Sequence, residues 1–126
     1  MPTKTNWNLA KQELGRRGET AARDYLAGRG YQIIESNYRS GRLEIDLIAQ
    51  LGNEMIFIEI KTRNRTREGR DENPLTPFQA KNLKRAITAY CHKNRVNLSA
   101  ARLDLIIILV DAETQKADLQ HFRNIL

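Results

Sequence analysis

Two charged residues stand near the end of a predicted buried β-strand. The segment FIEIKTR, residues 57–63, alternates apolar side chains with Glu59 and Lys61. Because successive side chains of a strand point to opposite faces, Glu59 and Lys61 share the face of Phe57. A charge taken out of water costs several kcal/mol unless it is paired or bound to a metal. Glu59 and Lys61 therefore form either a structural ion pair or part of a site.

The preceding predicted strand supplies a second carboxylate. Glu44 and Asp46 share one of its faces, and the short turn LGNE joins it to the strand that carries Glu59. If the two strands pair as a hairpin, Asp46 and Glu59 lie on one face with Lys61 close by. Two carboxylates with a backbone carbonyl suit a hard cation such as Mg²⁺ or Mn²⁺, and a neighbouring lysine can orient water or stabilise charge on a phosphate. Metal-assisted phosphodiester hydrolysis requires this combination.

A structural role also accounts for these residues. Glu-x-Lys is common in strands, and the alternative is a strand-end ion pair between Glu59 and Lys61, with Asp46 at an edge. The spacing Asp-x(12)-Glu-x-Lys across a hairpin of apolar strands is rarer and favours a site.

The elements that position these residues follow an α/β order. Periodicity and turn residues predict helices over 8–27 and 77–94 and strands over 31–39, 43–50, 55–63, 102–110 and within 118–126. The crossover helix makes the third and fourth strands parallel. The expected fold is a single domain over 1–126, a three-layer α/β/α arrangement in the order αβββαβ(β) around a mixed sheet of four or five strands.

The charge balance favours a polyanionic partner. The chain has 21 Lys+Arg against 15 Asp+Glu, a net charge of +6. The expected nucleic-acid-binding residues belong to the polar loop after the third strand and to the outer face of the second helix: Arg63, Arg65, Arg67, Arg70, Lys81, Lys84 and Arg85. Contacts of this kind hold phosphates without reading sequence. For Lys81 and Lys84 a solvated helix face is the alternative.

Other reactive residue types do not form a site in the sequence. His92 and His121 lack metal-ligand spacing, and a lone Cys91 late in a helix is expected to be a packing residue. We expect Asp104 to pair with Arg102 on its strand; the alternative is that Asp104 joins the acidic cluster. The single cysteine, with no signal-peptide core and no apolar run of membrane-span length, predicts a cytoplasmic protein without a membrane partner.

Four segments, residues 15–39, 43–49, 57–63 and 102–106, resemble the YraN family of small bacterial proteins. That family is regarded as predicted endonucleases of the restriction-endonuclease-like superfamily, similar to archaeal Holliday-junction resolvases. The resemblance implies a PD-(D/E)XK site in which Asp46 and Glu59 are acidic ligands of Mg²⁺ or Mn²⁺ and Lys61 is the catalytic lysine. The Ile60 carbonyl is expected as a further ligand. Glu19 matches an acidic residue that related resolvases use at the metal site, and a solvated helix carboxylate is the alternative.

The chain departs from the family pattern at two positions. Leu43 stands where the family usually has a glycine, and Gly41 is expected to make the turn instead. Gln79 stands where the family commonly has a lysine, on the apolar face of the second helix. We predict either that Gln79 orients a water or phosphate near Lys61 or that it bonds backbone at the helix end.

The leading hypothesis is an endonuclease acting on DNA, with branched and single-stranded forms among the candidate substrates. The alternative is a non-catalytic nucleic-acid-binding or protein-recruiting module with the same fold. Intact Asp46, Glu59 and Lys61 favour the first, whereas Leu43 and the lack of base-reading features keep the second open. A symmetric junction as substrate would demand a homodimer with twofold symmetry.

Overall fold

The computed structural model describes residues 7–64, 75–111, 113–114 and 116–126, with side chains from residue 15 onward. Its elements are α1 (Trp7–Gly28), β1 (Gln32–Ser40), β2 (Leu43–Leu51), β3 (Glu54–Asn64), α2 (Pro77–Asn94), the short 3₁₀ helix η1 (Leu98–Ala100), β4 (Ala101–Val110) and β5 (Ala117–Phe122). These elements confirm the predicted order, including the edge strand at the C-terminal end.

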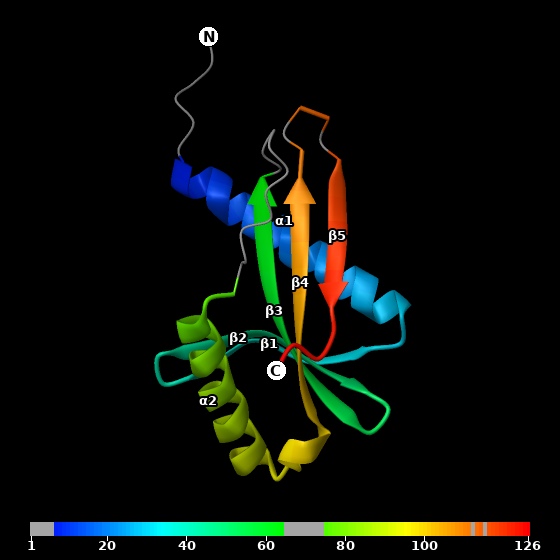
Figure 1. The fold of residues 1–126 in the computed structure, drawn as a ribbon. Helices are drawn as coiled ribbons and strands as arrows, with labels where there is room; N and C mark the ends of the chain where they lie inside the picture. Colours follow the sequence, from blue (N-terminus) through cyan, green and yellow to red (C-terminus); the bar gives the residue numbers. More distant parts are fainter. Residues whose placement is uncertain (1–6, 65–74, 112, 115) are drawn as a thin grey trace.

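One mixed sheet holds all five strands in the order β1-β2-β3-β4-β5. β1, β2 and β3 form an antiparallel meander, β3 and β4 are parallel, and β5 returns antiparallel to β4. α1 crosses behind the sheet, and α2 lies in front of its lower half (Figure 1). The fold is therefore three-layer α/β/α, as predicted, with α2 as the crossover between the parallel strands.

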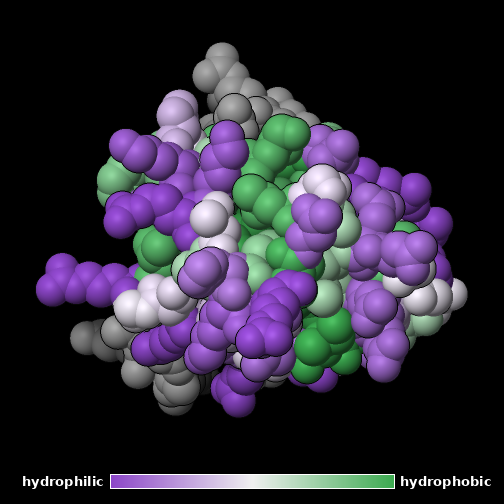
Figure 2. Space-filling model, turned by 90° about the horizontal axis from the view of Figure 1, so that it is seen from below, coloured by the Kyte–Doolittle hydropathy of each residue, from purple (hydrophilic) through white to green (hydrophobic). Residues whose placement is uncertain are grey.

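The outer surface is mostly polar, with separate apolar side chains on it. Seen from below, hydrophobic residues reach the surface near the middle of the molecule and hydrophilic residues surround them (Figure 2). Among the residues whose side chains the structure describes, the large hydrophobic ones that stay exposed are Ile34, Phe78, Leu98, Phe122 and Leu126. Within the described part of the chain, neither helix is long and apolar enough to cross a membrane.

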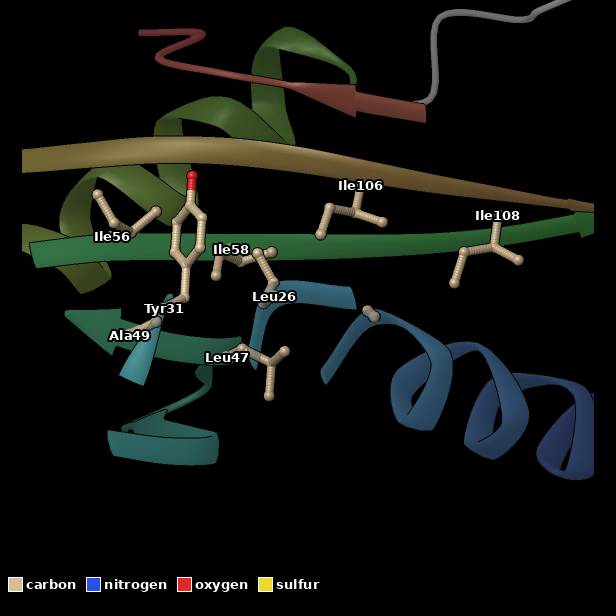
Figure 3. Packing of buried hydrophobic residues seen from close by; sticks show 9 residues of the cluster. Leu26, Tyr31, Leu47, Ala49, Ile56, Ile58, Ile106 and Ile108 are labelled. Atoms are coloured by element: carbon tan, nitrogen blue, oxygen red, sulfur yellow. The ribbon is translucent and has the colours of Figure 1, made fainter. Parts of the chain in front are cut away.

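Each face of the sheet has its own core. On the α1 side, Leu26 and Tyr31 pack against strand residues that include Ile58 and Ile106 (Figure 3). On the α2 side, Tyr90 and other residues of the helix cover the opposite face, which includes Phe57. Because both faces of β3 and β4 are covered, these strands read as nearly continuous apolar runs.

Local chemistry fixes the turns and the start of α2. Gly41 and Gly52 have positive φ of 63° and 60° in the two hairpin turns, a conformation that glycine adopts without strain. Gly41 thus makes the turn before Leu43, as predicted. Thr76 caps α2 and Pro77 occupies its first turn, also as predicted.

Gly18 on α1 lies close to β3 of the sheet. A Cβ at this position would collide with Oγ1 of Thr62 on β3. We expect Gly18→Ala to lower the free energy of unfolding by about 1–3 kcal/mol, because overpacking outweighs the gain in helix propensity of about 1 kcal/mol. Urea unfolding of the variant measures this loss.

Gly15, one turn earlier, is the matched control, because a Cβ there meets nothing within 4 Å. Gly15→Ala is expected to leave stability unchanged or to raise it, and Thr62→Ala to recover part of the loss at Gly18. Equal effects of the two alanines would contradict the close packing at Gly18.

Candidate active site

Asp46 lies where the pairing between β2 and β3 ends. The last pair of this ladder is Leu47 with Ile58. Beyond it, the Asp46 carboxylate takes the place of a backbone acceptor, because Ile60 N–H donates to Asp46 Oδ2 at 2.8 Å. One oxygen of Asp46 is therefore fixed by the backbone of β3 beside Glu59.

A break in the alternation of β2 turns Asp46 toward β3. Ile45 belongs to the α2-side core and Leu47 to the α1-side core, although residues two apart in a regular strand share a face. On the neighbouring strand β1, Asn37 lies opposite Asp46 in the register and has a left-handed φ of 53°. The irregular backbone on both strands explains why Asp46 points toward β3 and away from either core.

Glu59 has a strongly perturbed carboxyl group. Burial raises its pKa, and a hydrogen bond with Asp46 together with the charges of Asp46 and Glu44 raises it further, while Lys61 lowers it. The result is a pKa of about 9, against an ordinary 4.5. The Asp46–Glu59 pair therefore holds a proton at neutral pH, at a position where a bound cation would neutralise both carboxylates.

Lys61 follows on the same face of β3 and is partly buried. It acts on Glu59 through space, and no ion pair joins the two within the described residues. The predicted alternative, a Glu59–Lys61 ion pair, is therefore not formed in this structure. The lysine charge stays available near the two carboxylates.

An open pocket of about 170 Å³ lies beside Glu59, between the β1–β2 turn and the first two turns of α2. Its lining residues are Arg42, Leu43, Glu44, Glu59, Gln79, Asn82 and Leu83. Arg42 and Asn82 were missed by sequence reasoning. A signal for Asn82 existed, since it lies one helical turn after Gln79.

Gln79 closes the capping box of α2. Its N–H donates to Thr76 Oγ1 at 3.1 Å, and its Oε1 accepts from Thr76 N–H at 3.2 Å. The predicted bonding to backbone at the helix end is confirmed. The side chain also lines the pocket with Glu59, and the capping box leaves its amide nitrogen unused, so both predicted roles are compatible.

Glu19 bonds to β1, the strand that pairs with β2. It is partly buried on α1, and its Oε1 accepts from Asn37 Nδ2 at 3.3 Å. Among the described residues, no three His, Cys, Asp or Glu side chains lie together as a metal-binding group. The structure thus brings together Asp46, Glu59 and the Ile60 backbone, and it places Glu19 beside the strand residue opposite Asp46.

The oxygen atoms of Asp46, Glu59 and the Ile60 carbonyl are suitable ligands for a hard cation. Since N–H and C=O of one strand residue point to the same neighbour, the Ile60 carbonyl faces the β2 side, beyond the last β2–β3 pair. Asp46 keeps one oxygen outside its bond to Ile60. Two carboxylates and a carbonyl are ligands that Mg²⁺ and Mn²⁺ prefer.

The predicted phosphate-binding residues are only partly described. Arg63 is exposed at the end of β3, and Lys81, Lys84 and Arg85 are exposed on α2, as expected for its outer face. The other predicted contacts, Arg65, Arg67 and Arg70, lie outside the described residues.

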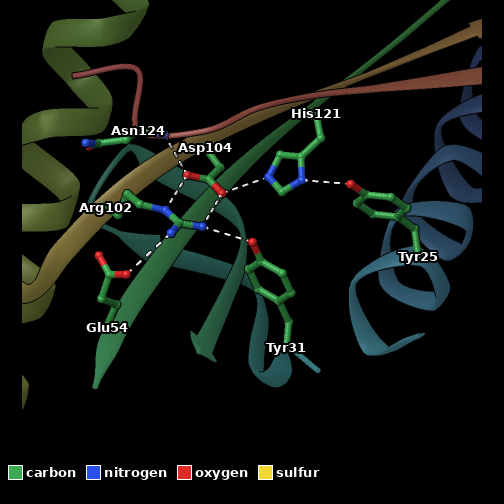
Figure 4. A network of polar contacts seen from close by, with 7 residues as sticks. All are labelled: Tyr25, Tyr31, Glu54, Arg102, Asp104, His121 and Asn124. Carbon is green, nitrogen blue, oxygen red and sulfur yellow. Dashed lines mark hydrogen bonds and ion pairs between the residues drawn. The ribbon is translucent and has the colours of Figure 1, made fainter. Parts of the chain in front are cut away.

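Asp104 belongs to a separate network on the α1 side of the sheet. It accepts from Arg102 Nε and Nη2 at 2.9 Å each and from Asn124 N–H at 2.9 Å, and it lies 2.7 Å from His121 Nε2 (Figure 4). Tyr25 bonds the other ring nitrogen of His121 at 3.0 Å. The expected Arg102–Asp104 pair is confirmed, and Asp104 is not among the residues that line the pocket.

Replacing Glu59 by glutamine is expected to remove a pH dependence of stability. The unfolded chain releases the Glu59 proton near pH 4.5 and the folded chain near 9, so stability falls as pH rises between these values. In the absence of divalent metal, Glu59→Gln should match wild type at pH 4.5 and exceed it by roughly 2 kcal/mol or more at pH 9. Urea unfolding at pH 5, 7 and 9 measures the difference.

The control is Glu113→Gln, at an exposed position in the turn before β5. It should follow the wild-type pH profile. A constant difference between Glu59→Gln and wild type at all three pH values would contradict the raised pKa.

Comparison with known proteins places the chain in a family. The model of a family described as "Uncharacterised protein family UPF0102" matches residues 18–108, well over half of the chain. The chain belongs to the UPF0102 family. The matched region contains Asp46, Glu59, Lys61 and the whole pocket, and membership agrees with the YraN resemblance.

Relatives from several bacteria match most of this UPF0102 chain. A UPF0102 protein of Chlorobium limicola is 43% identical over 99 residues, which is 79% of this chain and 77% of the relative. One from Leifsonia xyli is 37% identical over 116 residues, covering 92% and 98%. One from Syntrophomonas wolfei is 35% identical over 113 residues, covering 90% and 96%. Neither the family description nor these names assigns a reaction.

Proposed function

We propose that this UPF0102 chain is a metal-dependent endonuclease of the PD-(D/E)XK type, which hydrolyses phosphodiester bonds of DNA. The observation that carries the proposal is the Asp46–Glu59 carboxyl pair beside an open pocket. Too little positive charge surrounds the two carboxyl groups to keep both ionised, so the pair holds a proton at neutral pH. Lys61 lies two residues after Glu59. A perturbed carboxylate pair of this kind in a cleft is characteristic of functional sites. The strand order with a crossover helix after the third strand agrees with the proposal.

Each residue has a defined role. Asp46, Glu59 and the Ile60 carbonyl would hold Mg²⁺ or Mn²⁺. The bound cation would supply an activated water and charge neutralisation on the phosphate. The hydrogen bond from Ile60 N–H orients Asp46. The Lys61 ammonium would stabilise the negative charge that develops on the phosphate oxygens.

The pocket wall would hold the scissile phosphate group. Arg42 brings a guanidinium suited to phosphate oxygens, and Gln79 has an amide nitrogen that its capping box does not use. Exposed Arg63, Lys81 and Arg85 would contact the backbone further away. DNA is the proposed partner because the chain carries a net charge of +6 and such contacts follow a phosphate backbone.

Cleavage assays test this function. Wild type and the nearly isosteric variant Asp46→Asn are each incubated with nucleic acid in Mg²⁺ or Mn²⁺. The substrates are linear duplex, single-stranded, flap and four-way-junction DNA and the matching RNA. The proposal expects metal-dependent cleavage of at least one DNA by wild type and loss of that activity by about 10²–10³-fold in the variant.

The outcomes separate the alternatives. Cleavage of RNA but not of DNA would show that RNA is the substrate in place of DNA. DNA binding without cleavage in either metal would favour the non-catalytic nucleic-acid-binding module. Cleavage that survives Asp46→Asn unchanged would place the activity elsewhere. A homodimer is expected if the four-way junction is the preferred substrate, because two symmetric cuts need two sites.

A further inference from the structure

Phe78 is exposed on α2, beside a residue that lines the pocket. The residue stands in the first turn of α2, next to Gln79, and 73% of its surface is accessible. Among the large hydrophobic residues that stay exposed in the described chain, it has the highest exposed fraction. Its ring takes no part in the α2-side core, although the same helix buries Leu83, Ala86 and Ile87. Packing against the described residues therefore does not account for an aromatic side chain here.

The helix places Phe78 between the pocket and a basic surface. Residues three, four and seven positions later lie on the same side of a helix, which here are Lys81, Asn82 and Arg85. Asn82 lines the pocket, whereas Lys81 and Arg85 are exposed. One side of α2 thus combines an aromatic ring, two cations and Asn82, a polar residue that lines the same pocket as Glu59.

We infer that Phe78 is a stacking platform for an unpaired base of single-stranded or branched nucleic acid whose backbone enters the pocket. The inference rests on the proposed function, because it assigns the strand's phosphates to the pocket and to Lys81 and Arg85. Aromatic rings beside cations bind single strands by stacking on bases whatever their sequence. Bases inside a duplex are already stacked on their neighbours, so duplex DNA gains little from this ring.

Binding without cleavage tests the inference. Fluorescence anisotropy in a metal-free buffer with chelator compares labelled single-stranded, flap and duplex DNA of equal length. Phe78→Ala is expected to weaken binding of single-stranded and flap DNA by about 5- to 100-fold and to leave duplex binding unchanged. Phe78→Tyr restores a stacking ring and is expected to restore affinity. Phe78→Leu keeps an apolar side chain but has no aromatic ring. Its affinity for single-stranded and flap DNA should be as low as that of the alanine variant.

Several results would overturn the inference. Wild-type affinity of Phe78→Ala for single strands, or an equal loss for duplex, would exclude a stacking role. So would a rescue by leucine as good as that by tyrosine. A change in oligomeric state on Phe78→Ala, measured by sedimentation, would make the ring a contact between copies of the chain instead.

The design also separates this inference from the proposed activity. If wild type cleaves no nucleic acid but Phe78→Ala selectively loses affinity for single strands, the stacking role of Phe78 stands and the endonuclease proposal fails. If wild type cleaves DNA and Phe78→Ala binds and cleaves every substrate as wild type does, the platform alone fails.

Discussion

Replacing Asp104 by asparagine is expected to lower the free energy of unfolding by about 3–5 kcal/mol, as the loss of one partner from a buried ion pair does. Asp104 is fully buried and has four hydrogen-bonding contacts, two with Arg102 and one each with His121 and Asn124. Asparagine has a single acceptor oxygen, so donors lose their partner, and Arg102, whose side chain is only 12% exposed, loses its counter-charge. Urea unfolding measures the loss.

A matched control is Glu54→Gln. Glu54 lies 3.5 Å from the same guanidinium, but its side chain is 52% exposed, so the loss should stay below about 1 kcal/mol. Equal losses for the two substitutions would contradict the assignment of the network's stability to Asp104.

The pH dependence of wild type offers a second check on this network. Burial alone would raise the pKa of Asp104, but hydrogen bonds from Arg102, Asn124 and His121 together lower it below the ordinary 3.8. A lowered folded pKa gives stability that is present above 3.8 and is lost as the pH falls through the folded value.

Replacing Lys61 by methionine is expected to reduce single-turnover cleavage by about 10²–10³-fold, because it removes a charge that acts on the transition state. Methionine has a similar length without the ammonium. Since Lys61 makes no ion pair within the described residues and is not a metal ligand, folding and Mn²⁺ binding should remain. The rate is measured with enzyme in excess over whichever DNA wild type cleaves fastest.

Lys93→Met, in the last turn of α2, is the control for loss of one positive charge. It should cleave at the wild-type rate. A Lys61→Met enzyme as fast as this control would remove Lys61 from the catalytic machinery, and one that no longer bound Mn²⁺ would show a structural role.

The fold was predictable because local signals and the global arrangement agree. Gly41 and Gly52 mark the two hairpin turns, Thr76 and Pro77 mark the start of α2, and the apolar run of β4 indicates a strand covered on both faces. Given those elements, the crossover rule alone makes β3 and β4 parallel.

The site was predictable only where strand alternation and hairpin register hold. Glu59 and Lys61 follow alternation, and the hairpin register, whose last pair is Leu47 with Ile58, brings Asp46 and Glu59 to the same end of the ladder. The turn of Asp46 toward the Ile60 backbone depends on a break in β2 and a left-handed Asn37, which carry no periodic signal. Position in sequence therefore identifies the residues, while the irregular backbone gives their orientation.

The contacts that sequence reasoning missed join distant segments. Tyr25 and His121 are 96 residues apart, and Asn124 reaches Asp104 from 20 residues away. Without a known packing of α1 on the sheet, no spacing rule connects these residues. Arg42 was missed for a related reason, since only the docking of α2 makes the β1–β2 turn a pocket wall.

Calorimetric titration of Mn²⁺ into wild type, Asp46→Asn and Glu59→Gln tests the central claim most directly. Repeating it at pH 7 in two buffers of different ionisation enthalpy also counts released protons. We predict one site in wild type whose occupation releases about one proton, because the carboxyl pair gives up the proton it holds. We predict at least tenfold weaker binding in both variants, as expected when a ligand is removed. Absence of Mn²⁺ binding to wild type, or equal binding by all three proteins, would contradict the assignment of Asp46 and Glu59 as a metal site.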